Sequence, residues 1–103
     1  MAKKYNRSWV AKKIVIDFNQ KQWRQDIGAF ISEKRYWFFA KVTRSKILDR
    51  VTNTKTFEIY NKHGISFYIT YRDQNKVIDC SDKDLIQKYF EDKNMIIEVE
   101  KHE

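Results

Sequence analysis

Few side chains in this sequence have the types and spacing that catalysis or metal binding requires. The two glycines, Gly28 and Gly64, stand far apart, so the sequence contains no glycine-rich phosphate loop. His63 falls in an expected turn and His102 is next to the last residue, and neither has further ligands at metal-binding spacing. Because a catalytic or metal site needs several convergent groups, we expect no metal and no cofactor.

The one cysteine, Cys80, directly precedes an expected helix, and a helix N-terminus can lower the pKa of a thiol. Asp79, Asp82 and Asp84 surround it, and their negative charge opposes formation of the thiolate. These acids lack the glycine and terminal glutamate of a calcium loop and are typical of helix capping. We therefore predict that Cys80 is a buried or semi-buried residue at a strand end. A lone cysteine also excludes an internal disulfide, which indicates a cytoplasmic location.

One enzymatic alternative stays open. Small basic ribonucleases can work without metal, through side chains that exchange protons with a 2′-hydroxyl and its phosphate. Lys62, His63, Tyr68 and Arg72 lie on or beside one expected hairpin. Since nothing in the sequence brings these four together, we expect a non-enzyme and keep a metal-independent ribonuclease as a minor alternative.

The distribution of charge is uneven along the 103 residues, whose formal net charge is +7. Residues 1–55 carry 14 basic and four acidic side chains, whereas residues 56–103 carry seven basic and ten acidic ones. Such clustering favours a negatively charged partner, either nucleic acid or an acidic protein surface. The alternative is a solvated, lysine-rich surface without a partner.

The hydrophobic pattern predicts a single domain at residues 9–103, preceded by a flexible basic arm at residues 1–8. The apolar runs are far too short to span a membrane. The predicted order of elements is β-α-β-β-β-β-α-β, an α+β fold of two layers in which both helices cover one face of a mostly antiparallel sheet. This order resembles the ferredoxin-like βαββαβ plan with additional strands in the middle.

Both helices are predicted from apolar residues that recur at helical spacing. The first follows an alternating strand at 10–18 and begins with Asn19 as N-cap, and Gly28 within it indicates close packing against the sheet. The second begins with Ser81 as N-cap and leads into a last strand at 95–99. The apolar stripes are Trp23, Ile27, Phe30 and Ile31 in the first helix and Leu85, Ile86, Tyr89 and Phe90 in the second.

The first middle strand, expected at 36–44, is apolar on both of its faces. Tyr36, Phe38, Ala40 and Val42 would lie on one side, and Trp37 and Phe39 on the other. Two helices cover only one face of a sheet, so one of these sets needs another cover. Three covers stay open: the chain itself, through the N-terminal arm or residues 47–54; a second copy packed sheet against sheet; or a different partner.

Aromatic rings beside cations suit nucleic acid, because rings stack on unpaired bases while cations neutralise phosphates. We therefore predict a small non-enzymatic module that binds nucleic acid or a nucleoprotein complex through its basic, aromatic N-terminal half. The predicted contacts are Lys3, Lys4, Arg7, Trp9, Lys12 and Lys13 in and near the arm, with Trp37, Lys41, Arg44 and Arg50 on the sheet.

The alternative from another class is a protein–protein interaction factor, a small regulator or inhibitor of a larger cellular machine. In that case the aromatic patch would anchor the complex and the basic half would steer association with an acidic partner surface. A homodimer is compatible with either function.

Overall fold

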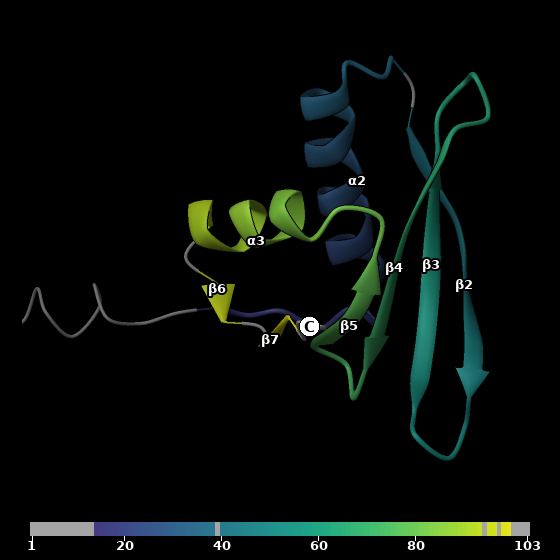
Figure 1. Ribbon diagram of the computed structural model, residues 1–103, viewed down its shortest axis with the longest axis vertical. Helices are drawn as coiled ribbons and strands as arrows, with labels where there is room; N and C mark the ends of the chain where they lie inside the picture. Colours follow the sequence, from purple (N-terminus) through teal and green to yellow (C-terminus); the bar gives the residue numbers. More distant parts are fainter. Residues whose placement is uncertain (1–13, 39, 94, 97, 100–103) are drawn as a thin grey trace, which may run out of the picture.

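The computed structural model describes residues 14–38, 40–93, 95–96 and 98–99, and the side chains within 16–38 and 40–93. Within these residues, two helices and seven strands follow one another (Figure 1). Their bounds are β1 (Ile14–Val15), α2 (Lys21–Arg35), β2 (Lys41–Asp49), β3 (Thr54–Tyr60), β4 (Ser66–Arg72), β5 (Lys76–Cys80), α3 (Lys83–Asp92), β6 (Met95–Ile96) and β7 (Glu98–Val99).

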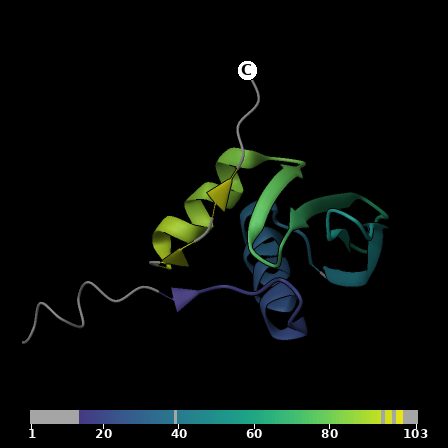
Figure 2. The same ribbon diagram turned by 90° about the horizontal axis from the view of Figure 1, so that it is seen from below.

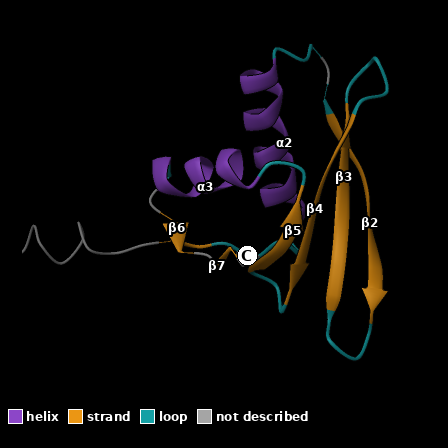
Figure 3. Ribbon diagram, in the orientation of Figure 1, coloured by secondary structure: helices purple, strands orange, loops and turns teal. Residues whose placement is uncertain are grey.

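The main sheet has the strand order β2-β3-β4-β5-β7 (Figure 3). Strands β2 to β5 are antiparallel neighbours joined by short turns, and β7 adds to β5 in parallel. A separate parallel pair joins β1 to β6. The predicted α+β class is confirmed. The ferredoxin-like comparison is not confirmed, because the four middle strands lie in the sheet in the order in which they occur along the chain.

Both helices pack on the same face of the main sheet (Figure 2). The cross-strand pairs Phe57–Ile69 and Ile59–Phe67 form the inner face, and all four residues are at most 1% exposed. Phe18, which precedes α2, joins this face to α3, since its ring lies 5.9 Å from Phe57 and 6.2 Å from Phe90. The alternation of the strands thus places Phe57 and Ile59 of β3 and Phe67, Ile69 and Tyr71 of β4 under the helices.

The apolar stripes of the helices face the sheet as predicted. Ile27 and Ile31 of α2 and Ile86, Tyr89 and Phe90 of α3 are buried, and the remaining stripe residues Trp23, Phe30 and Leu85 are half-buried against the same core. The helical periodicity was sufficient to predict which residues are buried, because each helix has one wide apolar face and that face packs on the core.

The predicted caps are wrong by one residue at both helices. Helix α2 begins after Gln20, and the Asn19 side chain instead accepts hydrogen bonds from Lys55 Nζ (2.9 Å) and the Tyr71 hydroxyl (3.2 Å). Helix α3 begins after Asp82, whose carboxylate accepts from the Leu85 amide at 3.1 Å. Ser81 is left outside the helix, where its hydroxyl accepts from the Tyr68 amide.

The strand expected at 36–44 begins only at Lys41, so the prediction is wrong for the residues before Lys41. Tyr36 has a φ of 59°, the left-handed conformation that ends a helix. Two bonds then fold the chain back on α2: the Trp37 amide donates to the Ser32 carbonyl at 2.9 Å, and the Ser32 hydroxyl donates to the Trp37 carbonyl at 2.6 Å. Tyr36, Trp37 and Phe38 therefore lie in a loop and not on two faces of a strand, and Phe39 lies outside the described residues.

The predicted turn between β3 and β4 is confirmed. Gly64 has a φ of 82°, and the Asn61 side chain accepts hydrogen bonds from the backbone amides of His63 and Ile65. The predicted arm at 1–8 and the strand residues 10–13 lie outside the described residues. In the part of the chain that is described, neither helix is long and apolar enough to cross a membrane.

Candidate nucleic-acid interface

The face of the main sheet that points away from the helices is the candidate interface, and we call it the open face. Along β3 and β4 its residues alternate with the apolar residues of the core, so their side chains point away from that core, and β2 adds the residues that pair with them. Within the described residues, no helix packs over it. The open face consists of Lys41, Arg44, Lys46 and Asp49 of β2, Thr54, Thr56, Glu58 and Tyr60 of β3, Ser66, Tyr68, Thr70 and Arg72 of β4, and Lys76 and Asp79 of β5.

Two tyrosines and three cations share one end of the open face. Lys41 pairs with Tyr60 across β2 and β3, and Arg44 pairs with Glu58, which in turn pairs with Tyr68. Tyr60 and Tyr68 are therefore diagonal neighbours on one face, about 7–8 Å apart by standard sheet geometry. Lys46 follows Arg44 along the same strand. Half-buried rings beside exposed cations thus lie together on the surface.

The carboxylates among these cations accept hydrogen bonds from the tyrosines. The Tyr60 hydroxyl donates to Glu58 at 3.2 Å, and the Tyr68 hydroxyl donates to Asp79 at 3.0 Å. The bond to Asp79, helped by burial, raises the pKa of Tyr68 above its ordinary value of 10.0. Tyr68 is therefore a neutral donor at physiological pH, and its ring is held in place by the bond.

Short side chains form the middle of the open face. The Thr70 hydroxyl donates to the Thr56 hydroxyl at 3.1 Å, and Thr56 donates to the Ile69 carbonyl at 3.1 Å. Both threonines are nearly buried, 8–9% exposed. Their hydroxyls are satisfied within the sheet, so this part of the face is uncharged, and the cations of β2 lie along its rim.

The sequence-predicted site residues have different positions in the structure. Lys41 and Arg44 are exposed on the open face, and Arg50 is exposed in the turn after β2. Trp37 is corrected: it lies in the loop after α2, half-buried against the core, and not on the sheet. Lys3, Lys4, Arg7, Trp9, Lys12 and Lys13 lie outside the described residues.

The contacts predicted from the sequence do not include Tyr60, Tyr68 or Arg72, which lie on the open face. The signal for them was the strict alternation in the hairpin, which leaves every second residue of β3 and β4 on one face.

The four residues of the ribonuclease alternative do not converge. Lys62 and His63 lie in the β3–β4 turn, whereas Arg72 ends β4, six residues beyond Ser66 and thus about 20 Å away at the rise of an extended strand. Tyr68 lies along β4 between the turn and Arg72, and its hydroxyl donates a hydrogen bond to Asp79. General acid–base chemistry needs groups within hydrogen-bond reach of one substrate, and this arrangement does not provide them.

Cys80 and Asp82 have the structural roles predicted from sequence, whereas Asp79 does not cap a helix. Cys80 is 7% exposed at the end of β5, and burial raises the pKa of its thiol from 9.0 to about 11. Asp82 caps α3 and pairs with Arg35 at 3.0 Å, while Asp79 accepts from Tyr68. Among the described residues, no group of three or more histidines, cysteines or acids could hold a metal ion.

A second surface feature lies at the far end of the β2–β3 hairpin. Three aliphatic side chains are exposed there: Ile47 by 51%, Leu48 by 56% and Val51 by 94%. Asp49 accepts hydrogen bonds from the backbone amides of Val51 and Thr52, which fixes the turn that carries them. We call these three residues the aliphatic tip.

Comparisons with family models, with curated proteins and with solved structures found no match to this chain.

Proposed function

We propose that this protein is a non-enzymatic module that binds single-stranded nucleic acid across the open face of its sheet. One observation carries the proposal: Tyr60 and Tyr68 lie beside Lys41, Arg44 and Lys46 on a face that the helices leave uncovered. A single strand can splay its bases onto rings, while its phosphates need cations at the rim. The buried Cys80 and the absence of cysteine partners in the sequence suit a cytoplasmic location, which belongs to the same proposal.

The positions of the charged groups on the open face support the proposal, because its carboxylates are hydrogen-bonded and its cations on β2 are exposed. Glu58 and Asp79 accept bonds from tyrosine hydroxyls, so each carboxylate lies in the face next to a donor. Lys41, Arg44 and Lys46 are exposed on β2, the edge strand of the sheet. A row of cations along an edge can follow a phosphate backbone, which gives weak sequence preference and strong dependence on salt.

Fluorescence anisotropy with labelled 12-mer single strands and duplexes, measured at several salt concentrations, tests the proposal. We expect single strands to bind more tightly than duplexes. Replacing Arg44→Gln should weaken binding to all sequences alike and reduce the slope of log affinity against log salt by about 1. Tyr68→Ala should remove stacking of about 1–3 kcal/mol and leave the slope unchanged.

Lys88→Gln is the matched control, because Lys88 is exposed on α3 and has the same charge as the cations of β2. Its removal should leave both affinity and salt slope close to those of the parent protein. Absence of binding at low salt, or an equal loss with Lys88→Gln and Arg44→Gln, would remove the open face as the interface.

The aliphatic tip favours a second candidate function, a protein–protein interaction factor. Exposed Ile47, Leu48 and Val51 next to the cations of β2 would fit a partner with an apolar patch and an acidic rim. A complex that survives nuclease treatment and is lost with Val51→Asp, but not with Tyr68→Ala, would support this candidate. Light scattering on the purified chain distinguishes a foreign partner from a homodimer.

A further inference from the structure

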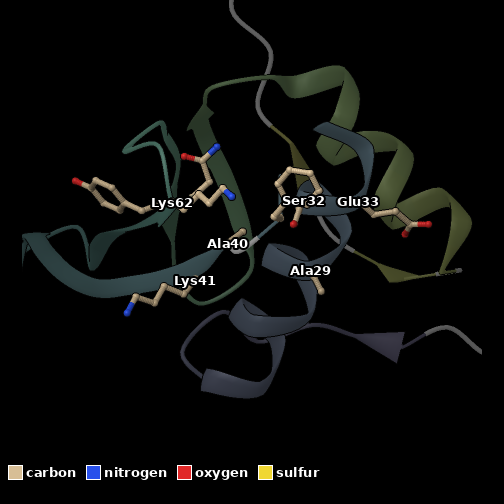
Figure 4. Close-up of a pocket in the computed structure, with 9 residues that line it drawn as sticks. Ala29, Ser32, Glu33, Ala40, Lys41 and Lys62 are labelled. Atoms are coloured by element: carbon tan, nitrogen blue, oxygen red, sulfur yellow. The ribbon is translucent and has the colours of Figure 1, made fainter. Parts of the chain in front are cut away.

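A groove of about 830 Å³ lies at the end of the open face that carries Tyr60. It is formed by the second half of α2, the loop that follows, the start of β2 and the β3–β4 turn (Figure 4). These segments are distant in the sequence and meet because α2 packs on β2 and β3. The packing is close at Gly28, where a Cβ atom would lie 3.6 Å from Val42 Cγ2 and 4.0 Å from Ile59 Cγ2. This volume is in the range of pockets that hold small organic ligands.

The apolar wall of the groove contains an exposed aromatic ring. Phe38 is 74% exposed, and Ala29 and Ala40 lie beside it in the wall. The Lys62 ammonium lies 4.8 Å from the centre of the Phe38 ring. A large apolar ring that remains accessible next to a cation is suited to a flat ligand that carries negative charge.

The charges at the groove favour an anion. Lys62 points from the β3–β4 turn towards Ser32 on α2, whereas the carboxylate of Glu33 points away from Lys62 (Figure 4). Lys41 lies on the opposite side of the groove from Glu33, with its amine directed outwards. Lys62 therefore reaches into the groove, whereas Glu33, which also lines it, directs its carboxylate away from Lys62.

Asn61 provides a second, independent sign of a ligand. This residue lines the groove and is 7% exposed, and two backbone amides fix its side-chain oxygen at 2.9 and 3.0 Å. Its Nδ2 must therefore be the free end of the amide, and it is buried with no hydrogen-bond partner among the described residues. Buried donors in proteins are nearly always paired, so an acceptor supplied by a ligand would remove this cost.

We propose that the groove holds one unpaired nucleobase of the strand, with its phosphate at Lys62 and a base carbonyl or ring nitrogen at Asn61. This inference rests on the proposed function and adds the location of one nucleotide. Lys41 and Tyr60 are cross-strand partners that belong both to the open face and to the groove, so a strand on the face continues directly into it. The base stacks on Phe38, as unpaired bases do on exposed rings.

The experiment is an NMR titration of ¹⁵N-labelled full-length protein with uridine monophosphate, adenosine monophosphate and inorganic phosphate. We expect the side-chain amide signal of Asn61 to shift with both nucleotides and to shift little with phosphate alone. Phe38→Ala should weaken nucleotide binding about tenfold or more, the effect of losing one stacked base. Tyr36→Ala is the matched control, because Tyr36 is an exposed ring, 88% accessible, in the same loop and outside the groove.

The outcomes distinguish the groove from the open face. If Arg44→Gln weakens binding of the 12-mer but Phe38→Ala and Tyr36→Ala have equal effects, the groove inference is overturned and the proposed function stands. If the 12-mer does not bind but nucleotides shift Asn61, the proposed function fails and the groove stands as a nucleotide site. Equal shifts with phosphate and with nucleotides overturn base binding, as does a shift with an acidic peptide such as Glu-Glu and none with nucleotides.

Discussion

The Tyr89 hydroxyl donates a hydrogen bond to the Asp26 carboxylate and thereby ties α3 to α2, although 63 positions separate the two residues. The Tyr89 ring is fully buried and meets Phe30 edge-on at 5.0 Å, so the bond lies at the border of the core. Burial, and then the bond to Asp26, raises the pKa of Tyr89. Tyr89 therefore remains a neutral donor over the range in which the protein would be studied.

Replacing Tyr89→Phe should lower the free energy of unfolding by about 1 kcal/mol, because a hydrogen bond to a charged acceptor is lost while the ring is kept. The loss is smaller than the roughly 1.5–3 kcal/mol typical of a charged acceptor, because Asp26 is 41% exposed and stays solvated. Urea unfolding followed by tryptophan fluorescence measures it. A change within error of zero would show that the bond does not join the helices.

Asn19 should act as an acceptor between strands and not as a helix cap. Asn19→Ser keeps a good capping residue but is too short to reach Lys55 and Tyr71, so we expect a loss of about 1–3 kcal/mol in stability. Asn19→Asp is the control, since it keeps the length and both acceptor contacts and should cost less. Chemical denaturation of the two variants decides between the roles: a serine variant as stable as the parent protein would restore the capping interpretation.

Gly28→Ala should stabilise the protein by about 0.5–1 kcal/mol, because glycine is a poor residue in the interior of a helix. A Cβ at this position would lie 3.6 Å from Val42 Cγ2, an ordinary van der Waals distance, so the packing has room for it. Thermal and urea unfolding measure the change. The reverse substitution on the exposed position next to it, Ala29→Gly, should destabilise by a similar amount, and a destabilised Gly28→Ala variant would contradict the prediction.

The Cys80 thiol should react slowly in the folded protein. Since burial raises its pKa from 9.0 to about 11, the thiolate fraction at pH 8 is about 100-fold lower than in the unfolded chain. A colorimetric disulfide reagent, with and without urea, measures the difference in rate. Similar rates in the two states would show that the thiol is accessible.

The raised pKa of Cys80 makes the free energy of unfolding depend on pH. The unfolded chain loses the thiol proton first, so the contribution of Cys80 to stability is fully present below about pH 9 and is lost as the pH rises towards 11. Comparison of the parent protein with Cys80→Ala from pH 8 to 11 isolates this contribution from those of the tyrosines. A pH dependence that is identical in the two proteins would contradict it.

Local pattern was enough to predict both helices, the hairpins between β3, β4 and β5 and the turn at Gly64. Ile27 and Ile31, like Ile86 and Phe90, recur at helical spacing, and a stripe of that kind has one face to bury. The alternation of Phe57 and Ile59 with polar residues likewise decides which side of a strand points to the core. These features depend on neighbours in the sequence, so the sequence by itself determined them.

The tertiary structure decided the conformation of residues 36–38 and which residues line the groove. A left-handed residue at Tyr36 and two bonds between Ser32 and Trp37 place these residues in a loop, which no periodicity could distinguish from a strand. Asn19 was predicted as a helix cap from its neighbours in the sequence. Its actual bonds to Lys55 and Tyr71 span 36 and 52 positions of the chain, so local pattern could not indicate them. The groove has the same origin, since Phe38 and Asn61 approach each other only when α2 packs on the sheet. Long-range contacts of this kind depend on the folded chain as a whole, and local sequence patterns report only on residues that are close along the chain.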